Sequence, residues 1–137
     1  MKHVWYSACI FLLLLQGCSN DPIISGTLDM TEGQGWKPMV YLVRPTGFGE
    51  LGQSFMGKLV DSSKVDSNGH FQFGKQMKTK DTVLYEVVVQ KEGEKYPNRL
   101  ENGNPETDNY FPLVWSSGES LVLNADMHLY LIHFCRC

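Results

Sequence analysis

Two histidines and two cysteines lie close together near the C-terminal end of the chain, at His128, His133, Cys135 and Cys137. Zinc prefers these ligand types, and the spacing of the histidines fits a structural zinc site. The cysteines are separated by a single residue, whereas structural zinc sites favour about two to four residues between paired cysteines. A disulfide between the two would close a very small, strained ring. We therefore expect no bound metal and no cofactor. A disulfide to another partner, or no role at all, remains open for these cysteines.

The carboxylates are scattered along the chain, and their spacing indicates no catalytic pair, which would need two carboxyl groups converging in one cleft. The run Asp66-Ser67-Asn68-Gly69 has the opening residues of a calcium loop but lacks the later ligands and the terminal glutamate. Ser116-Ser117-Gly118 does not fit the G-x-S-x-G turn of serine hydrolases. We therefore assign no catalytic residue and expect a protein that is not an enzyme.

Four aromatic residues are candidates for contact with a partner: Trp36, Tyr96, Tyr110 and Trp115. On a shared exposed face they would form a platform for a glycan or a peptide. The alternative is that these rings belong to the core, where most aromatic side chains of a β-sandwich lie. The polar connection 97–109 is expected to be a long exposed loop. It is the preferred place for partner contact, because loops on a rigid scaffold commonly carry function.

A further cysteine, Cys18, follows directly after an apolar run near the N-terminus. This run, Ala8–Leu15, is shorter than the ~20 residues that a bilayer-spanning helix needs. A basic start, a short apolar run and a small residue are typical of a cleaved secretory signal peptide. The sequence Leu15-Gln16-Gly17-Cys18 resembles the lipobox of bacterial lipoproteins, from which Gln16 departs because that position is usually small. The alternative is an ordinary signal peptide in which Cys18 is incidental.

The lipobox resemblance implies a signal peptide over 1–17 and a lipidated Cys18, with a short polar tether over 18–22. Several acyl chains, each stabilised by about 0.8 kcal/mol per buried methylene, would hold the protein on a membrane. Ser19 after the cysteine implies sorting to the outer membrane, where the domain faces either the periplasm or the cell exterior. The membrane is thus the first expected partner.

Composition and charge narrow the remaining function classes. The chain has 137 residues, a formal net charge of −3 and 42% hydrophobic residues, which is typical of one globular domain. No basic block occurs in the sequence. A nucleic-acid groove needs clustered lysine and arginine, so nucleic acid is not an expected partner.

The elements that would position these residues are short strands separated by Gly, Asn, Asp and Pro. Asn68-Gly69 predicts a hairpin turn, because both residues readily adopt the positive φ angles that such turns need. After this turn, Phe71 and Phe73 fall on one face and are expected in the core. The strongest predicted strand is Leu84–Val89, which is rich in valine. About seven short strands over 23–126 predict an all-β fold, a small antiparallel β-sandwich.

Four segments of this predicted sandwich form a recurring pattern: a glycine-containing opening strand, a strand containing Val-Tyr-Leu, a long turn segment, and a closing strand that follows a glycine. They are Ser25–Leu28, Met39–Leu42, Gly57–Phe73 and Ser117–Leu123. Together they resemble the DUF4369-type domain, a small β-sandwich of uncharacterised role in lipoproteins of Bacteroidetes, over roughly Pro22 to Asp126. The turn segment is also similar to those of carboxypeptidase-regulatory and transthyretin-like sandwiches.

This resemblance implies a lipid-anchored, non-enzymatic module of the cell envelope. In that family the sandwich often precedes a thioredoxin-like domain with a C-x-x-C motif. The implied partner is such a domain or another envelope protein. Residues 127–137 do not continue this pattern, so we expect an apolar tail left by truncation or a frameshift. The alternative is a final edge strand on a sandwich that acts alone and binds glycan or peptide.

Overall fold

The computed structural model describes residues 24–30, 35–47, 57–74, 79–99, 108–127 and 132–136. These residues form strands and no helix. The strands are β1 (Ile24–Asp29), β2 (Trp36–Arg44), β3 (Lys58–Lys64), β4 (His70–Gln72), β5 (Val83–Lys91), β6 (Tyr110–Trp115), β7 (Leu121–Asp126) and β8 (Ile132–Arg136). Within these described residues, no helix is long and apolar enough to cross a membrane.

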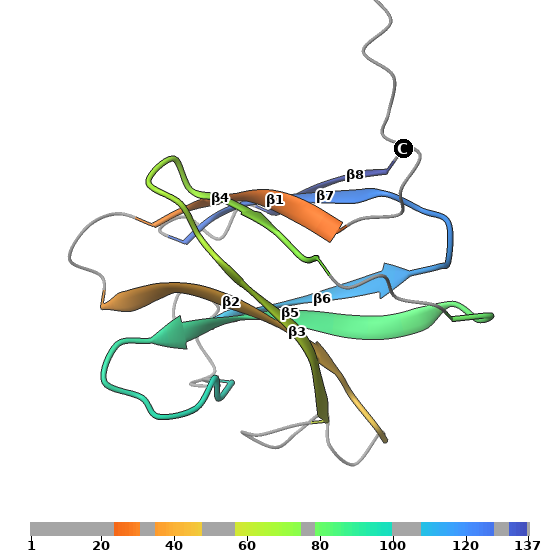
Figure 1. Ribbon diagram of the computed structural model, residues 1–137, viewed down its shortest axis with the longest axis horizontal. Helices are drawn as coiled ribbons and strands as arrows, with labels where there is room; N and C mark the ends of the chain where they lie inside the picture. The colour runs from red at the N-terminus through yellow and green to blue at the C-terminus, as the bar shows by residue number, and fades with distance from the viewer. Residues whose placement is uncertain are drawn as a thin grey trace, which may run out of the picture.

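The strands build two four-stranded sheets that lie face to face (Figure 1). Sheet A has the order β4-β1-β7-β8, and sheet B has the order β3-β2-β5-β6. The expected all-β sandwich is confirmed, with eight described strands instead of about seven. In the described part of the chain the ladders are antiparallel with one exception, since β1 and β7 pair in parallel. Parallel neighbours need a crossover connection, and here the chain between them passes through sheet B.

The core lies between the sheets and contains large side chains from both. The alternating burial of β6 places Phe111, Leu113 and Trp115 on its inner face. The Trp115 ring meets Tyr85 of β5 edge to face, with ring centres 6.4 Å apart. On sheet A, Phe71 and the adjoining Phe73 are buried, as predicted from their spacing.

The strand β5 is buried on both faces, which explains its continuous hydrophobic character. Its inner face carries Tyr85, Val87 and Val89, whereas Glu86 and Gln90 are buried on the opposite face. Burial of these two polar residues requires polar partners. The chain that follows β5 supplies a partner to each, and Tyr41 of β2 supplies a second partner to Gln90.

The turn at Asp66–Gly69 is confirmed, but the expected hairpin is wrong. The Gly69 amide donates to the Asp66 carbonyl oxygen at 3.0 Å, and Gly69 has a φ of +80°. Strand β3, before the turn, pairs with β2 in sheet B, whereas β4, after it, pairs with β1 in sheet A. The turn therefore carries the chain from one sheet to the other, because Phe71 and Phe73 must cover the core from the side of sheet A.

The segment near the C-terminus, which was expected to be an apolar tail, contains a strand. Residues Ile132–Arg136 form β8, which pairs antiparallel with β7 along its whole length. This is the alternative interpretation, a final edge strand. The described side chains of β8, from His133 to Cys135, are exposed.

The connection 97–109 was expected to be exposed, and its described ends correct that expectation. Arg99 and Asn109 are both buried. The Asn109 side-chain amide donates to the Val89 carbonyl at 2.6 Å and to the Asn98 carbonyl at 2.9 Å. Both ends of the connection are therefore fixed against the outer face of β5.

Candidate functional site

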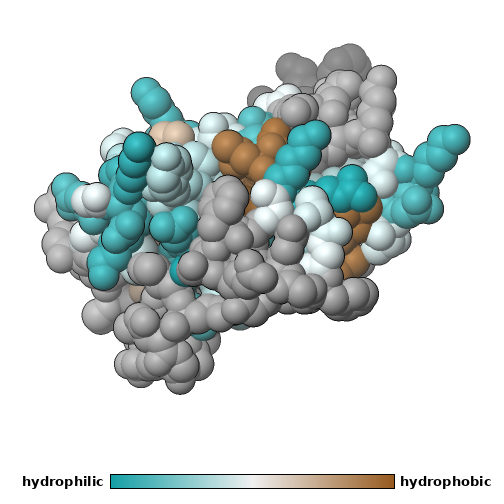
Figure 2. Space-filling model, turned by 90° about the horizontal axis from the view of Figure 1, so that it is seen from below, coloured by the Kyte–Doolittle hydropathy of each residue, from teal (hydrophilic) through white to brown (hydrophobic). Residues whose placement is uncertain are grey.

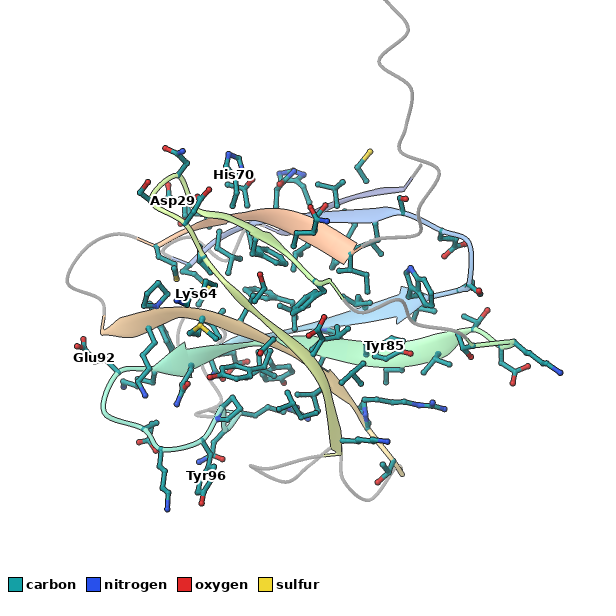
Figure 3. All side chains as sticks on the ribbon, in the orientation of Figure 1. Asp29, Lys64, His70, Tyr85, Glu92 and Tyr96 are labelled. Atoms are coloured by element: carbon teal, nitrogen blue, oxygen red, sulfur yellow. The ribbon has the colours of Figure 1, made fainter. Side chains whose placement is uncertain are left out.

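The four candidate aromatic residues do not share an exposed face. Trp115 is 0% exposed, and its indole N–H donates to the Glu119 carbonyl at 2.9 Å inside the sandwich. Trp36 is half-buried and packs against the core. Only Tyr96 among the four is largely exposed, at 55%, and Figure 3 shows it projecting from the connection that follows β5. Trp115 is thus excluded from any surface platform, because its ring is fully buried in the core.

Tyr110 lies under a buried ion pair on the outer face of sheet B. The guanidinium carbon of Arg99 stands 3.8 Å from the centre of the Tyr110 ring. Its Nη1 donates to Glu86 Oε1 at 3.3 Å, and both charged side chains are almost fully buried. This position gives Tyr110 a structural role, because the ring forms the platform on which Arg99 reaches Glu86.

Neighbouring polar contacts fix the connection that follows β5 next to this ion pair. The Tyr41 hydroxyl donates to Gln90 Oε1 at 2.6 Å, and the Gln90 amide donates to the Glu94 carbonyl at 2.8 Å. From the other side, the Lys37 ammonium donates to the same carbonyl at 2.8 Å. Both buried polar residues of β5, Glu86 and Gln90, thus contact the chain that covers them.

The outer face of sheet A is polar and forms the strongest candidate for a binding surface. The strand registers place His70, Thr27, Asn124 and His133 in one row across the four strands. In this row His70 Nδ1 lies 3.1 Å from Thr27 Oγ1. Figure 3 shows His70 and Asp29 on this outer side, close to the turn that joins β3 and β4.

Two hollows adjoin this row and share Thr27 and Asp29. One has a volume of about 350 Å³ and extends to the turn Asp66–Gly69. The other has a volume of about 430 Å³ and extends over Asn124, Asp126 and His133. Among the described residues that line the two hollows there are three aspartates and no lysine or arginine.

The carboxylate of Asp66 is already engaged by the turn. Its Oδ1 accepts the backbone N–H groups of His70 and Asn68, each at 2.8 Å. The hydrogen bond from the His70 amide is the main cause that lowers the pKa of Asp66 below its usual value. Asp66 therefore organises the turn that borders the hollow.

The chemistry of this surface is hydrogen bonding by carboxylates, an amide, a hydroxyl and imidazoles. Such groups recognise polyhydroxylated or cationic ligands. This surface was not predicted from the sequence, although a signal for it is present. Polar residues alternate with buried ones at Thr27 and Asp29, and again at Asn124 and Asp126. The alternation alone does not show that β1 and β7 are neighbours, so it does not predict that these residues share one surface. The sheet order shows it.

The remaining predicted residues are only partly described. His133 and Cys135 are exposed on β8, where Cys135 is a free thiol. Cys18, His128 and Cys137 lie outside the described residues. Within the described ranges, no group of three or more histidine, cysteine or acidic side chains is arranged to hold a metal ion.

Comparison with known proteins gives no assignment. No family model matches the chain, and neither a curated protein nor a solved structure is similar enough to count as a match.

Proposed function

We propose that this protein is a lipid-anchored, non-enzymatic β-sandwich module of the bacterial cell envelope, of the DUF4369 type, that accompanies thiol–disulfide oxidoreductases. The observation that supports this proposal is the place of the segments that carry the family resemblance. Three of them contribute β1, β4 and β7, which are neighbours in sheet A, and Met39–Leu42 lies in β2. The shared pattern thus falls on residues that build the sandwich.

Individual residues of the pattern have packing roles. A side chain at Gly26 would collide with the backbone carbonyl of Leu123 on the neighbouring β7. At Gly69 a side chain would meet the Leu28 carbonyl, and the positive φ is itself unfavourable for other residues. Phe71 and Phe73 pack edge to face in the core, with ring centres 5.6 Å apart. These roles favour a domain that serves as a scaffold.

The proposed anchor lies close to the first strand. Cys18 precedes Ile24, the first residue of β1, by six residues. A fully extended tether of this length spans roughly 20 Å. A lipidated Cys18 would therefore hold the sandwich near the membrane surface, next to whatever envelope protein it accompanies.

The anchor is tested by fractionating cells that express Cys18→Ala. We expect the wild-type protein in the membrane fraction and the variant outside it, because the acyl chains are lost. Cys135→Ala is the matched control, since it removes an exposed thiol on β8 and should stay with the membrane. Continued membrane attachment of Cys18→Ala would contradict the anchor.

The association with an oxidoreductase needs a separate test. Chemical cross-linking in intact cells, followed by mass spectrometry, should enrich proteins with a thioredoxin-like domain relative to cells lacking this chain. If such proteins are recovered equally from both cell types, the proposed partnership is wrong.

The polar surface of sheet A favours a second candidate function, the capture of a polyhydroxylated ligand such as a glycan. The supporting observation is the pair of hollows that meet at Thr27 and Asp29. A glycan array would test it with the wild type and Asn124→Ala, since Asn124 lines one hollow and is exposed. Saturable binding that the variant loses, and that Tyr96→Ala retains, would place the ligand on sheet A. An array without saturable binding would exclude this function.

A further inference from the structure

Three of the four edge strands carry features that prevent pairing with another chain. Strand β4 has three residues, and three of its backbone groups are already engaged: the His70 amide donates to Asp66 Oδ1, the His70 carbonyl accepts from the Asp66 amide, and the Gln72 amide donates to Ser63 Oγ. A strand whose outward groups are bonded within its own chain offers little to a partner.

The two edges of sheet B are protected in other ways. In β3 the ladder shifts register, so that Val60 is an extra residue opposite Leu42 and Val43, and exposed Lys58 and Lys64 stand at the two ends. In β6, Pro112 lies within the strand and has no N–H to donate. Bulges, terminal lysines and prolines are the usual means by which natural sheets avoid edge-to-edge association.

Strand β8 has no bulge and no proline, and its one charged residue is Arg136 at its end. It ends the order of sheet A, and in the described part of the chain no strand lies beyond it. Its five residues pair with β7 without a shift of register and include no proline and no lysine. At its centre, Phe134 is 48% exposed. The outer edge of β8 is thus a regular strand edge with an exposed aromatic side chain.

We infer that this edge binds β8 of a second copy of the chain, in antiparallel pairing about a two-fold axis at Phe134. This register pairs all five residues: Phe134 lies opposite Phe134 of the second copy, His133 opposite Cys135, and Ile132 opposite Arg136. A two-fold axis at any other residue of β8 would leave residues unpaired. The result is one continuous sheet across the two molecules.

The side chains of β8 fit this occupant. The strand contains no acidic residue, and its one permanent charge is on Arg136, at its end. Antiparallel pairing about Phe134 places the two arginines at opposite ends of the paired strands, so like charges are not opposed. The contact is small beside a standard stable interface, so we expect a weak dimer that depends on concentration.

The test measures the mass of the full-length protein in mild detergent by sedimentation equilibrium, over about a hundredfold range of concentration. The wild type should shift from one chain to two. Phe134→Lys should weaken the dimer at least about tenfold, because it removes the apolar contact and opposes two like charges at the axis. Val114→Lys and Leu59→Lys are matched controls, since these residues are 43% and 50% exposed on the protected edges, and both variants should dimerise as the wild type does.

Hydrogen exchange gives a second readout that does not depend on any substitution. Amides of β8 should become more protected as concentration rises, whereas those of β3, β4 and β6 should not change. A wild type that stays monomeric at all concentrations overturns the inference. So does a dimer that Val114→Lys or Leu59→Lys weakens as much as Phe134→Lys, or one that leaves the exchange of β8 unchanged. None of these readouts requires a lipidated Cys18, so their failure is distinct from failure of the proposed anchor.

Discussion

Asp66 is a surface residue whose charge matters because of the backbone groups around it. Its carboxylate accepts hydrogen bonds from the amides of Asn68 and His70, and so closes the turn between the two sheets. These bonds favour the ionised form, which lowers the pKa of Asp66 below 3.8 in the folded protein. A group whose pKa is lowered on folding stabilises the fold above its unfolded-state pKa. That contribution is lost as pH falls through the folded-state value.

The prediction at this scale concerns the pH dependence of thermal stability. Asp66→Asn keeps an oxygen acceptor but removes the charge, so its melting temperature should lie below that of the wild type near neutral pH. The difference should shrink as pH falls below about 4 and should close only below the lowered pKa of Asp66 in the folded protein, where the wild-type carboxylate is protonated. Thermal unfolding followed by circular dichroism at a series of pH values measures this difference. A difference that stays constant from neutral to acidic pH would contradict the proposed role of the charge.

Three other residues show which local features can be predicted from the sequence and which depend on contacts between distant segments. The turn glycine Gly69 was predicted, because Asn-Gly is a local signal. The need for glycine at position 26 was not predicted, because it arises from the Leu123 carbonyl on β7, far along the chain. The sequence also left open whether Trp115 is buried or exposed. Alternation within β6 shows that Trp115 shares a face with Phe111 and Leu113, but it does not show which face meets the core.

At the scale of elements, β5 and the chain that follows it form a unit held by polar contacts. The ion pair of Glu86 with Arg99 is buried, and Arg99 also stacks on Tyr110 of β6. Removing one member of a buried ion pair leaves a charge in a poorly solvated place, whereas removing both does not. The pair therefore fixes the position of the connection more than it adds to total stability.

A double-mutant comparison tests this unit. Glu86→Leu should lower the free energy of unfolding by about 3–5 kcal/mol, because the Arg99 guanidinium loses its ion-pair partner inside the protein. The combined Glu86→Leu and Arg99→Leu variant should be more stable than Glu86→Leu alone. Urea denaturation of the wild type, both single variants and the double variant gives these values. Additive losses in the double variant would show that the two side chains act independently.

The elements themselves were predicted better than their pairing. The segments at β1, β2, β4, β5, β6 and β7 follow from apolar runs between turn residues, which are local signals. The assignment of β3 and β4 to different sheets depends on contacts with β2 and β1, so a turn signal alone suggested a hairpin. The polar surface of sheet A was missed for the same reason, because its residues come from four strands.

For the whole molecule, the two sheets share a single core, to which both contribute buried aromatic side chains. In the described part of the chain each inner face is covered by the other sheet, so we expect the sheets to unfold together. The prediction is that loss of strand signal in far-UV circular dichroism and loss of tryptophan fluorescence, reported by buried Trp115, coincide in urea. Two separate transitions would show that one sheet persists without the other.

On the same scale, Figure 2 views the outer face of sheet B and shows separate hydrophobic patches among hydrophilic side chains. The exposed apolar residues known on this sheet, Leu59 and Val114, lie on its two opposite edge strands. Leu59→Lys and Val114→Lys therefore alter strand edges other than the one that carries Phe134, which makes them suitable controls for the dimer.

The parallel pairing of β1 with β7 has a consequence for the time course of folding. Ile24 and its partner Leu121 are separated by 97 residues, whereas β5 and β6 follow each other along the chain. Pairings between distant segments form slowly, because the loop entropy is lost before the contact is gained. During synthesis β1 emerges first but waits for almost the whole chain before its central neighbour exists. Until then β1 lacks one of its two flanking strands, so its apolar residues Ile24 and Leu28 are less covered than in the complete fold, and a chaperone would have its longest opportunity to bind there.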